Sequence, residues 1–204
     1  MVKKLDMIIA TKNEGKLKEI REMLKGLGIR LKGLNHFQEV PEIEEDGRSF
    51  LENALKKARF YCGFFSQPAL ADDSGLEVDA LKGAPGIFSA RYARPGASDR
   101  ENREKLLKEM EGIPTKKRGA AFKCVVAMVF PDGREIVTEG SCRGRIGFKE
   151  VGRRGFGYDP IFFLPRYGKT MAELTLEEKN RISHRGKALR KLRRSLERFL
   201  KKDG

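Results

Sequence analysis

The chain of 204 residues lacks the features that mark several large classes of protein. No apolar run approaches the roughly 18 residues that a membrane-spanning helix requires. The basic start, residues 1–4, is followed by an apolar stretch too short for a signal peptide. Only three cysteines, without a CxxC pair, and only two histidines exclude a zinc ribbon, a disulfide scaffold and a histidine-rich metal site. We therefore expect a cytoplasmic protein with no membrane partner.

Several catalytic and nucleic-acid-binding signatures are also missing. The phosphate-binding pattern GxxxxGK[ST] does not occur, which argues against a kinase. No Ser/His/Asp or Cys/His arrangement supports a covalent mechanism. The chain has no RNP-type aromatic pattern, zinc finger or Arg/Gly tract, so we expect no stable nucleic-acid partner.

Positive charge, in contrast, is abundant. The chain carries 43 Lys and Arg against 29 Asp and Glu, a net charge of +14. From Lys179 to Lys202 there are 11 Lys and Arg and one acid, Glu197. A basic helix of this kind can bind nucleic acid or a phosphorylated small molecule, or simply face solvent. Scarce glutamine with many Lys, Arg and Glu is also typical of proteins from hot environments, which would explain the charge without a ligand.

Hydrophobic periodicity predicts an α/β protein. A short apolar run at 5–10 and the stretch 29–34 are predicted strands, separated by a helix that ends near Gly28. The pattern at Ser49 is typical of a helix start, with Leu51 on the apolar face of a helix that ends at Pro68. Residues 68–71 then form a strand predicted to stop at Asp72. Similar capping patterns begin at Ser98 and Thr175, and the final helix carries an apolar stripe.

The middle of the chain contains its clearest hairpin signal. Residues 119–130 and 134–146 are rich in strand formers and flank the turn triplet Pro131-Asp132-Gly133. Cys124 and Cys142 would lie nearly opposite each other, either as free thiols or as a pair. Together with the earlier alternation of strands and helices, this predicts a mixed sheet in a single domain covering residues 1–204, with a helix-rich second lobe.

Three loops carry more functional groups than a turn needs. The first, Thr11 to Lys16, joins a strand to a helix, where main-chain N–H groups and the helix dipole favour an anion. The second, Asp72-Asp73-Ser74-Gly75, pairs two carboxylates at a predicted strand end. Such a pair repels itself and suits Mg²⁺ with phosphate, although an Asx turn is an alternative. An acidic cluster at 42–46 could add a metal ligand or face solvent.

The third set lies near the C-terminus. Glycines beside aromatics at 155–160 could form a slot in which a flat ring stacks and reaches main-chain groups. Lys179, His184 and Arg185 could converge on phosphate or a purine carbonyl, while a structural role for His184 is the alternative. From the residues alone, the chain is expected to be a Mg²⁺-assisted enzyme that acts on a phosphorylated, purine-like ligand.

Six motifs in this order resemble the inosine/xanthosine triphosphate pyrophosphatase family, from about residue 5 to about residue 200. They are TKNEGK, EIEEDGRSFLENALKKA, ADDSGL, GAPGIFSARYA, GFGYDPIFF and ELTLEEKNRISHRGKAL. The resemblance implies a mixed, strongly twisted central sheet with a long antiparallel hairpin, flanked by helices, and two lobes with a cleft between them. It also implies a homodimer. Ile87 and Phe88 could serve its interface, although packing in the core would explain these apolar residues equally well.

The resemblance assigns roles to residues. Asp73 matches the catalytic carboxylate, with Asp72 beside it, and Lys57 matches a lysine that contacts phosphates. Asp73 and Glu45 match the metal ligands, with Glu42 and Glu44 as alternatives to Glu45. The residues implied to bind substrate are Thr11, Lys12, Asn13, Glu14, Gly15, Lys16, Ser74, Phe156, Gly157, Tyr158, Asp159, Lys179, His184 and Arg185. The family's usual T-G-N opening is T-K-N here, so Lys12 departs from it.

The implied reaction is Mg²⁺-dependent hydrolysis of non-standard purine nucleoside triphosphates, namely ITP, dITP and XTP. Water attacks the α-phosphorus, and the products are a nucleoside monophosphate and pyrophosphate. A protein hydrogen-bond donor facing position six of the base would donate to the oxo group of inosine or xanthosine and leave the amino group of adenine mispaired.

Overall fold

The computed structural model describes residues 5–202, without the side chain of Lys202, so the basic start at 1–4 lies outside the described residues. The chain divides into two compact units, which are described separately. The first contains residues up to Asp73, Cys124–Gly140 and the chain from Arg185; the second contains Ser74–Lys123 and Ser141–His184. In the described part of the chain, no helix is long and apolar enough to cross a membrane.

A mixed sheet of seven strands in the order β2-β1-β3-β4-β5-β6-β7 confirms the predicted fold class. β1 runs parallel to β2 and β3, whereas β5, β6 and β7 pair antiparallel. The strands are β1 Leu5–Ile9, β2 Ile29–Gly33, β3 Ala69–Val78, β4 Gly119–Val129, β5 Glu135–Ile146, β6 Phe162–Leu164 and β7 Lys169–Thr170. The α-helices are α1 Glu14–Leu24, α2 Phe50–Phe65, α3 Asp99–Glu109, α4 Leu176–Ile182 and α5 His184–Lys202. Within residues 5–202, six short 3₁₀ helices lie between these elements, including η3 Gly86–Arg91 and η5 Asp159–Ile161.

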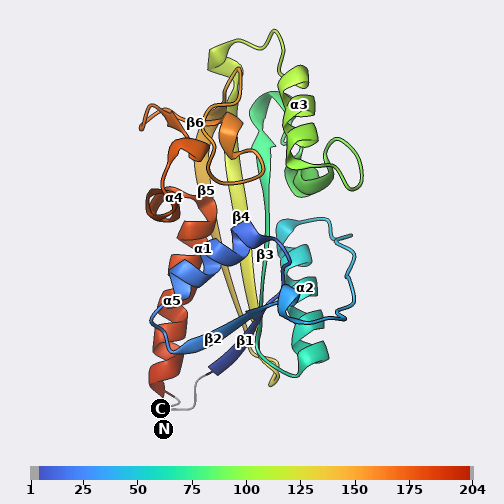
Figure 1. Cartoon of the computed structure of the whole chain (residues 1–204), viewed down its shortest axis with the longest axis vertical. Coiled ribbons are helices and arrows are strands. Elements are labelled where there is room, and N and C mark those ends of the chain that lie inside the picture. The colour runs from blue at the N-terminus through green and yellow to red at the C-terminus, as the bar shows by residue number, and fades with distance from the viewer. Residues whose placement is uncertain (1–4, 203–204) are drawn as a thin grey trace. The chain divides into compact units, whose positions relative to one another are not determined.

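The first unit has helices on both faces of its strands. Figure 1 shows α1 and α5 on one side and α2 on the other. Successive side chains of a strand point to opposite faces, and the two apolar cores follow this alternation. Leu70 of β3 packs with the α1 and α5 residues, whereas Ala69 and Ala71 pack with α2.

The predicted helix starts are confirmed. The side chain of Ser49 accepts a hydrogen bond from the Glu52 N–H at the start of α2. Ser98 and Thr175 form complete capping boxes with the glutamates three residues later. The buried face of α2 is rotated from the predicted one, and Leu51 is 43% exposed. The residues that face the core from α2 are Asn53, Ala54, Lys57, Ala58, Tyr61 and Cys62.

Strand β3 corrects the prediction that a strand stops at Asp72. The strand runs from Ala69 to Val78 and passes through both aspartates, Ser74 and Gly75. Asp and Gly are depleted in strands, which is why the sequence indicated a turn. The strand continues because each aspartate finds its own partners on its own face of the sheet, as described below.

The predicted hairpin is confirmed. β4 and β5 are joined by a turn in which the Phe130 N–H donates to the Arg134 carbonyl oxygen at 2.9 Å. Cys62, Cys124 and Cys142 are all buried free thiols, so Cys124 and Cys142 do not form a disulfide. They pack in different apolar cores, Cys124 with Leu70 and Cys142 with Leu76.

A buried arginine joins three segments of the second unit. The guanidinium of Arg118 donates hydrogen bonds to the carbonyl oxygens of Met110 at 2.6 Å, Ile146 at 2.8 Å and Gly147 at 2.7 Å. Arg118 is 2% exposed, and burial lowers its pKa. These bonds tie the end of α3 to the end of β5 around an apolar core that includes Leu106 and Phe162.

Candidate functional site

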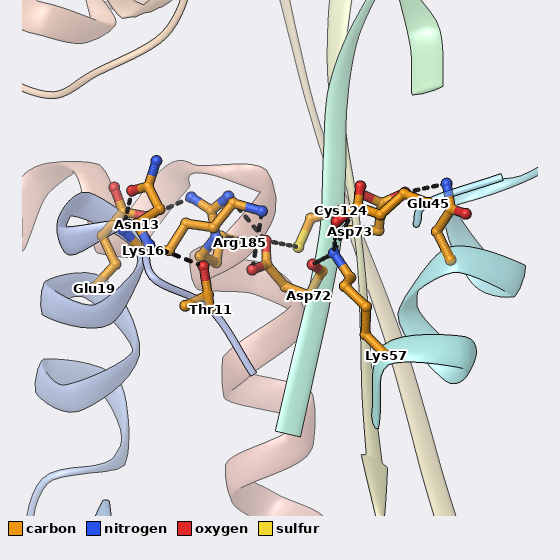
Figure 2. A network of polar contacts seen from close by, with 11 residues as sticks. Thr11, Asn13, Lys16, Glu19, Glu45, Lys57, Asp72, Asp73, Cys124 and Arg185 are labelled. Carbon is orange, nitrogen blue, oxygen red and sulfur yellow. Dashed lines mark hydrogen bonds and ion pairs between the residues drawn. The ribbon is translucent and has the colours of Figure 1, made fainter. Parts of the chain in front are cut away.

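Asp72 and Asp73 point to opposite faces of β3 (Figure 2). Asp72 shares the face of Leu70, next to α1 and α5, and Asp73 shares the face of Ala71, next to α2. The two carboxylates are therefore not the side-by-side pair expected for a turn. The carboxylate of each has different nearest partners, so each can have a separate role.

Asp72 is the centre of a buried ion network. Its Oδ2 accepts from Arg185 Nε at 3.1 Å and Nη2 at 3.0 Å, and its Oδ1 lies 3.1 Å from Lys16 Nζ. The third guanidinium nitrogen of Arg185, Nη1, donates to Glu19 Oε2 at 2.6 Å. Asp72 and Arg185 are 2% and 1% exposed. Two carboxylates and two cations thus balance on this face of the sheet.

The electrostatics of this network fix Asp72 in its ionised form. Burial opposes the charge, but Lys16 and Arg185 outweigh it and hold the pKa of Asp72 far below its ordinary value. The pKa of Arg185 is raised, because Asp72 and Glu19 outweigh its burial. Burial also raises the pKa of Cys124, whose Sγ lies 3.9 Å from Asp72 Oδ2. A carboxylate in this setting holds cations in place and is poorly suited to take up a proton.

Asp73 has a different environment on the α2 face. Its Oδ2 accepts from Asn53 Nδ2 at 3.1 Å, and its Oδ1 lies 3.8 Å from Lys57 Nζ. The Lys57 ammonium also donates to Glu45 Oε1 at 2.6 Å and to the main-chain oxygen of Asp72 at 2.8 Å. Burial raises the pKa of Asp73; Lys57 opposes this shift, whereas Glu45 adds to it.

Two carboxylates face one ammonium on this side, so Asp73, Glu45 and Lys57 together carry one excess negative charge. Burial lowers the pKa of Lys57, but Asp73 and Glu45 outweigh it and raise the pKa, so the lysine stays charged. Within residues 5–202, no cluster of three or more His, Cys, Asp or Glu side chains could hold a metal unaided. Two carboxylates still fit Mg²⁺, which binds through one or two of them together with water and phosphate.

The predicted phosphate loop begins α1. Asn13 is the N-cap, and its Oδ1 accepts from the Lys16 N–H at 2.9 Å, while Thr11 Oγ1 accepts from the Asn13 N–H at 3.1 Å. Lys12 is held by Glu42, with Nζ 2.8 Å from Oε1. Two members of the loop lie at the first turn of the helix, Glu14, which accepts from Asn35, and Gly15.

A second group of predicted residues comes together in the second unit. Lys179 Nζ donates to Asp159 Oδ2 at 2.5 Å and lies 4.6 Å from the centre of the Phe156 ring. Both charged residues are buried, at 4% and 2% exposed. Tyr158 donates through its hydroxyl to the Ser89 carbonyl oxygen at 2.8 Å. A buried cation beside an aromatic ring suits a flat polar ligand.

The remaining predicted residues have other surroundings. His184 is buried and stacks on Phe122, with ring centres 4.6 Å apart and planes at 14°. Arg185 belongs to the first unit and its three guanidinium nitrogens donate to Asp72 and Glu19. Ser74 follows Asp73 in β3 and belongs to the second unit.

Two residues of the site were missed from the sequence. Asn53 is fully buried against Asp73. It lies four residues before Lys57, a helical spacing that places both side chains on one face. Glu19 is 3% exposed and lies three residues after Lys16, which is also neighbour spacing on a helix. The spacing was visible in the sequence, but their partners on β3 and α5 were not.

Comparison with known proteins identifies related chains. Residues 7–195 match the model of the Ham1 family. A protein of Desulforamulus reducens named dITP/XTP pyrophosphatase is 50% identical over 195 residues, which cover 96% of this chain and 97% of the relative. A Geobacter sulfurreducens protein of the same name is 51% identical over 183 residues, covering 90% and 92%.

A solved structure agrees with the fold. The structure of a HAM1 protein from Coxiella burnetii has a TM-score of 0.86 and 43% identity, and the match covers 95% of this chain and 99% of that chain. The matches confirm the family resemblance inferred from the six sequence motifs.

The two faces of β3 predict opposite effects of two isosteric substitutions on stability. Asp72→Asn removes the charge that compensates Lys16 and Arg185 and should lower the free energy of unfolding by about 3 kcal/mol. Asp73→Asn removes a charge that burial already disfavours, so stability should stay the same or rise slightly. Urea unfolding followed by circular dichroism measures both, because the chain has no tryptophan. Equal losses would contradict the separation of the two carboxylates.

Proposed function

Because the chain belongs to the Ham1 family, we propose that it hydrolyses non-standard purine nucleoside triphosphates, dITP, XTP and ITP, to the monophosphate and pyrophosphate. The observation that carries the proposal is the buried Asp73 beside Lys57 and Glu45, in a chain half identical to dITP/XTP pyrophosphatases. The reaction would remove these nucleotides from the precursor pool. We propose that residues 1–204 act as one domain in the cytoplasm, where buried free thiols persist.

Asp73 and Glu45 are the residues that would hold Mg²⁺. Their excess negative charge over Lys57 supports this assignment, and Glu42 is engaged with Lys12 instead. Bound Mg²⁺ supplies charge neutralisation at the phosphate oxygens. Lys57, which contacts both Glu45 and the Asp73 carboxylate, adds a second positive charge to this side of the strand.

Asp73 is the proposed base. It orients a water molecule and accepts its proton as the water oxygen bonds to the α-phosphorus and the bond to the pyrophosphate oxygen breaks. The geometry supports this role, because the Asp73 carboxylate is buried and its Oδ2 accepts from Asn53 Nδ2 at 3.1 Å, which fixes its position. Asp72, held ionised by Lys16 and Arg185, keeps Lys16 at the phosphate-binding loop.

Phe156 and Lys179 are the proposed base-binding pair. The ring can stack on the purine, and the ammonium can donate to a 6-oxo group. The 6-amino group of adenine would leave this buried donor mispaired, which discriminates strongly. We assign Arg185 to positioning in the buried network, since its guanidinium is engaged by Asp72 and Glu19, and His184 to packing on Phe122.

A product analysis tests the reaction. With Mg²⁺, purified protein should convert dITP, XTP and ITP to monophosphate and pyrophosphate, and ATP at least about 10²-fold more slowly. Chelation with EDTA should abolish turnover, and added Mg²⁺ should restore it. Anion-exchange chromatography identifies the products. Stepwise release of orthophosphate, or equal rates with ATP, would rule out the proposed function.

The Asp73→Asn variant tests the base. Turnover of dITP should fall by about 10²–10⁴ because the proton acceptor is lost, while the melting temperature should stay the same or rise. The matched control is Glu44→Gln, an exposed acid in the segment that carries Glu45, which should keep normal turnover. A folded Asp73→Asn protein with near-normal turnover would remove Asp73 from the mechanism.

We also propose that the enzyme is a homodimer. Phe88 in η3 is 54% exposed, and the Arg91 guanidinium lies 5.2 Å from its ring centre. An exposed aromatic of this kind is a candidate interface residue. Light scattering at micromolar concentration should give about twice the 23.1 kDa chain mass, and Phe88→Asp should shift it toward one chain. A wild-type mass near that of one chain would exclude the dimer.

A further inference from the structure

Both main-chain polar groups of Gly157 are bound by side chains from the first two turns of α3. The Gly157 N–H donates to Asp99 Oδ2 at 2.6 Å. The Gly157 carbonyl oxygen accepts from Arg103 Nη1 at 2.8 Å. Asp99 and Arg103 are four residues apart, so they lie on one side of the helix. Two charged side chains thus clamp one peptide unit, and we call this pair the Gly157 clamp.

The clamp acts on the segment that forms the proposed base slot. Gly157 has φ +59°, so it sits at a sharp change of chain direction between Phe156 and Tyr158. The Phe156 N–H donates to Asp159 Oδ2 at 3.0 Å, and the same oxygen accepts from Lys179. The N–H and carbonyl oxygen of Gly157 point to α3 and are therefore committed to holding the segment.

The clamp itself is firmly anchored. Arg103 is held by Glu150, with Nε 2.9 Å from Oε1, and its side chain is only 13% exposed. Ser98 caps α3 through a complete capping box. Asn102 is 2% exposed and donates from Nδ2 to the Ala90 carbonyl oxygen at 3.2 Å. A binding group carried by a helix fixed in this way keeps its position better than one on an unsupported loop.

We propose that Asp99 and Arg103 are positioning residues for nucleobase recognition. They fix the Gly157 peptide and through it the ring of Phe156 against Lys179, and so set the affinity for the base without touching it. The inference rests on the proposed function, since Phe156 and Lys179 form the proposed base slot. A displacement of about 1 Å in a binding group is enough to change catalysis or binding strongly.

Binding of two ligands distinguishes a specific effect on the base slot from a general loss of structure. Inosine monophosphate probes the base slot, and inorganic pyrophosphate probes the phosphate site; isothermal titration calorimetry measures both. The disruptive variants are Asp99→Ala and Arg103→Met, alone and combined. Asp99→Asn is the rescue variant, because its amide oxygen can still accept from the Gly157 N–H. Arg100→Ala is the matched control, because Arg100 is an exposed arginine of the same helix whose Nε lies 2.7 Å from Glu104 Oε1.

We expect each disruptive variant to weaken inosine monophosphate binding about tenfold, with pyrophosphate binding unchanged within about twofold. The double variant should lose little more than either single one, because both side chains act on one peptide. Asp99→Asn and Arg100→Ala should bind both ligands normally. The preference for dITP over ATP should fall in parallel with the loss of inosine monophosphate affinity.

Other outcomes would contradict the proposed positioning role of the clamp. Equal weakening of both ligands would mean that α3 supports the whole fold. Normal inosine monophosphate binding by Asp99→Ala and Arg103→Met, with loss in Lys179→Met, would keep the base slot and reject the clamp. If a disruptive variant does not fold, Arg103→Lys replaces it, since lysine lacks the fork of separate nitrogens by which Arg103 reaches Glu150 and Gly157. Unchanged affinity in that variant would also reject the clamp. A wild-type protein that binds pyrophosphate but not inosine monophosphate would instead reject the proposed function.

Discussion

The buried charge of Asp72 determines how the first unit is held together around its functional groups. An ionised carboxylate in the interior is costly unless cations and hydrogen bonds compensate it. Arg185 from α5 and Lys16 from α1 supply that compensation, and Glu19 binds the remaining guanidinium nitrogen. One anion in the middle of β3 therefore positions two helices and the loop that begins the first of them. An apolar residue at position 72 could fill the same space, but it would remove the carboxylate that faces Lys16 and binds two guanidinium nitrogens of Arg185.

The opposite face of β3 carries a charged group that is not balanced by its own residues. Lys57 connects the two faces, because its ammonium donates to the main-chain oxygen of Asp72 and lies near the Asp73 carboxylate. With Glu45 it forms a group that carries excess negative charge and is only partly enclosed, since the Glu45 side chain is 31% exposed. A cation, a water molecule or a phosphate group can alter the balance here. The network around Asp72 is already balanced in charge and buried. The strand therefore has a fixed ion network on one face and, on the other, a charged group whose balance a bound ligand can change.

Local signals in the sequence predicted much of the fold. The capping residues Ser49, Ser98 and Thr175 begin helices as expected, and the hairpin turns where predicted, because these features depend on neighbours within a few residues. The course of β3 could not be predicted, since Asp72 and Asp73 are tolerated in a strand only through partners far away in the chain. The same holds for Glu19 and for the Asp99 contact with Gly157, which spans 58 residues.

The alternation of side chains along β3 also constrains the length of this strand. Between Ala69 and Asp73 each residue has a fixed face, and a strand that slips by one residue exchanges the faces of all its side chains. Insertion of one residue before Asp72 would turn its carboxylate to the face of Lys57 and Asn53, and would turn the other aspartate to the face of Arg185. Both aspartates would still be present in the sequence, but each would lie on the wrong face of the sheet. Insertions and deletions are therefore expected to be far more damaging here than in the turn at Pro131–Gly133, whose ion pair between Asp132 and Arg134 is exposed.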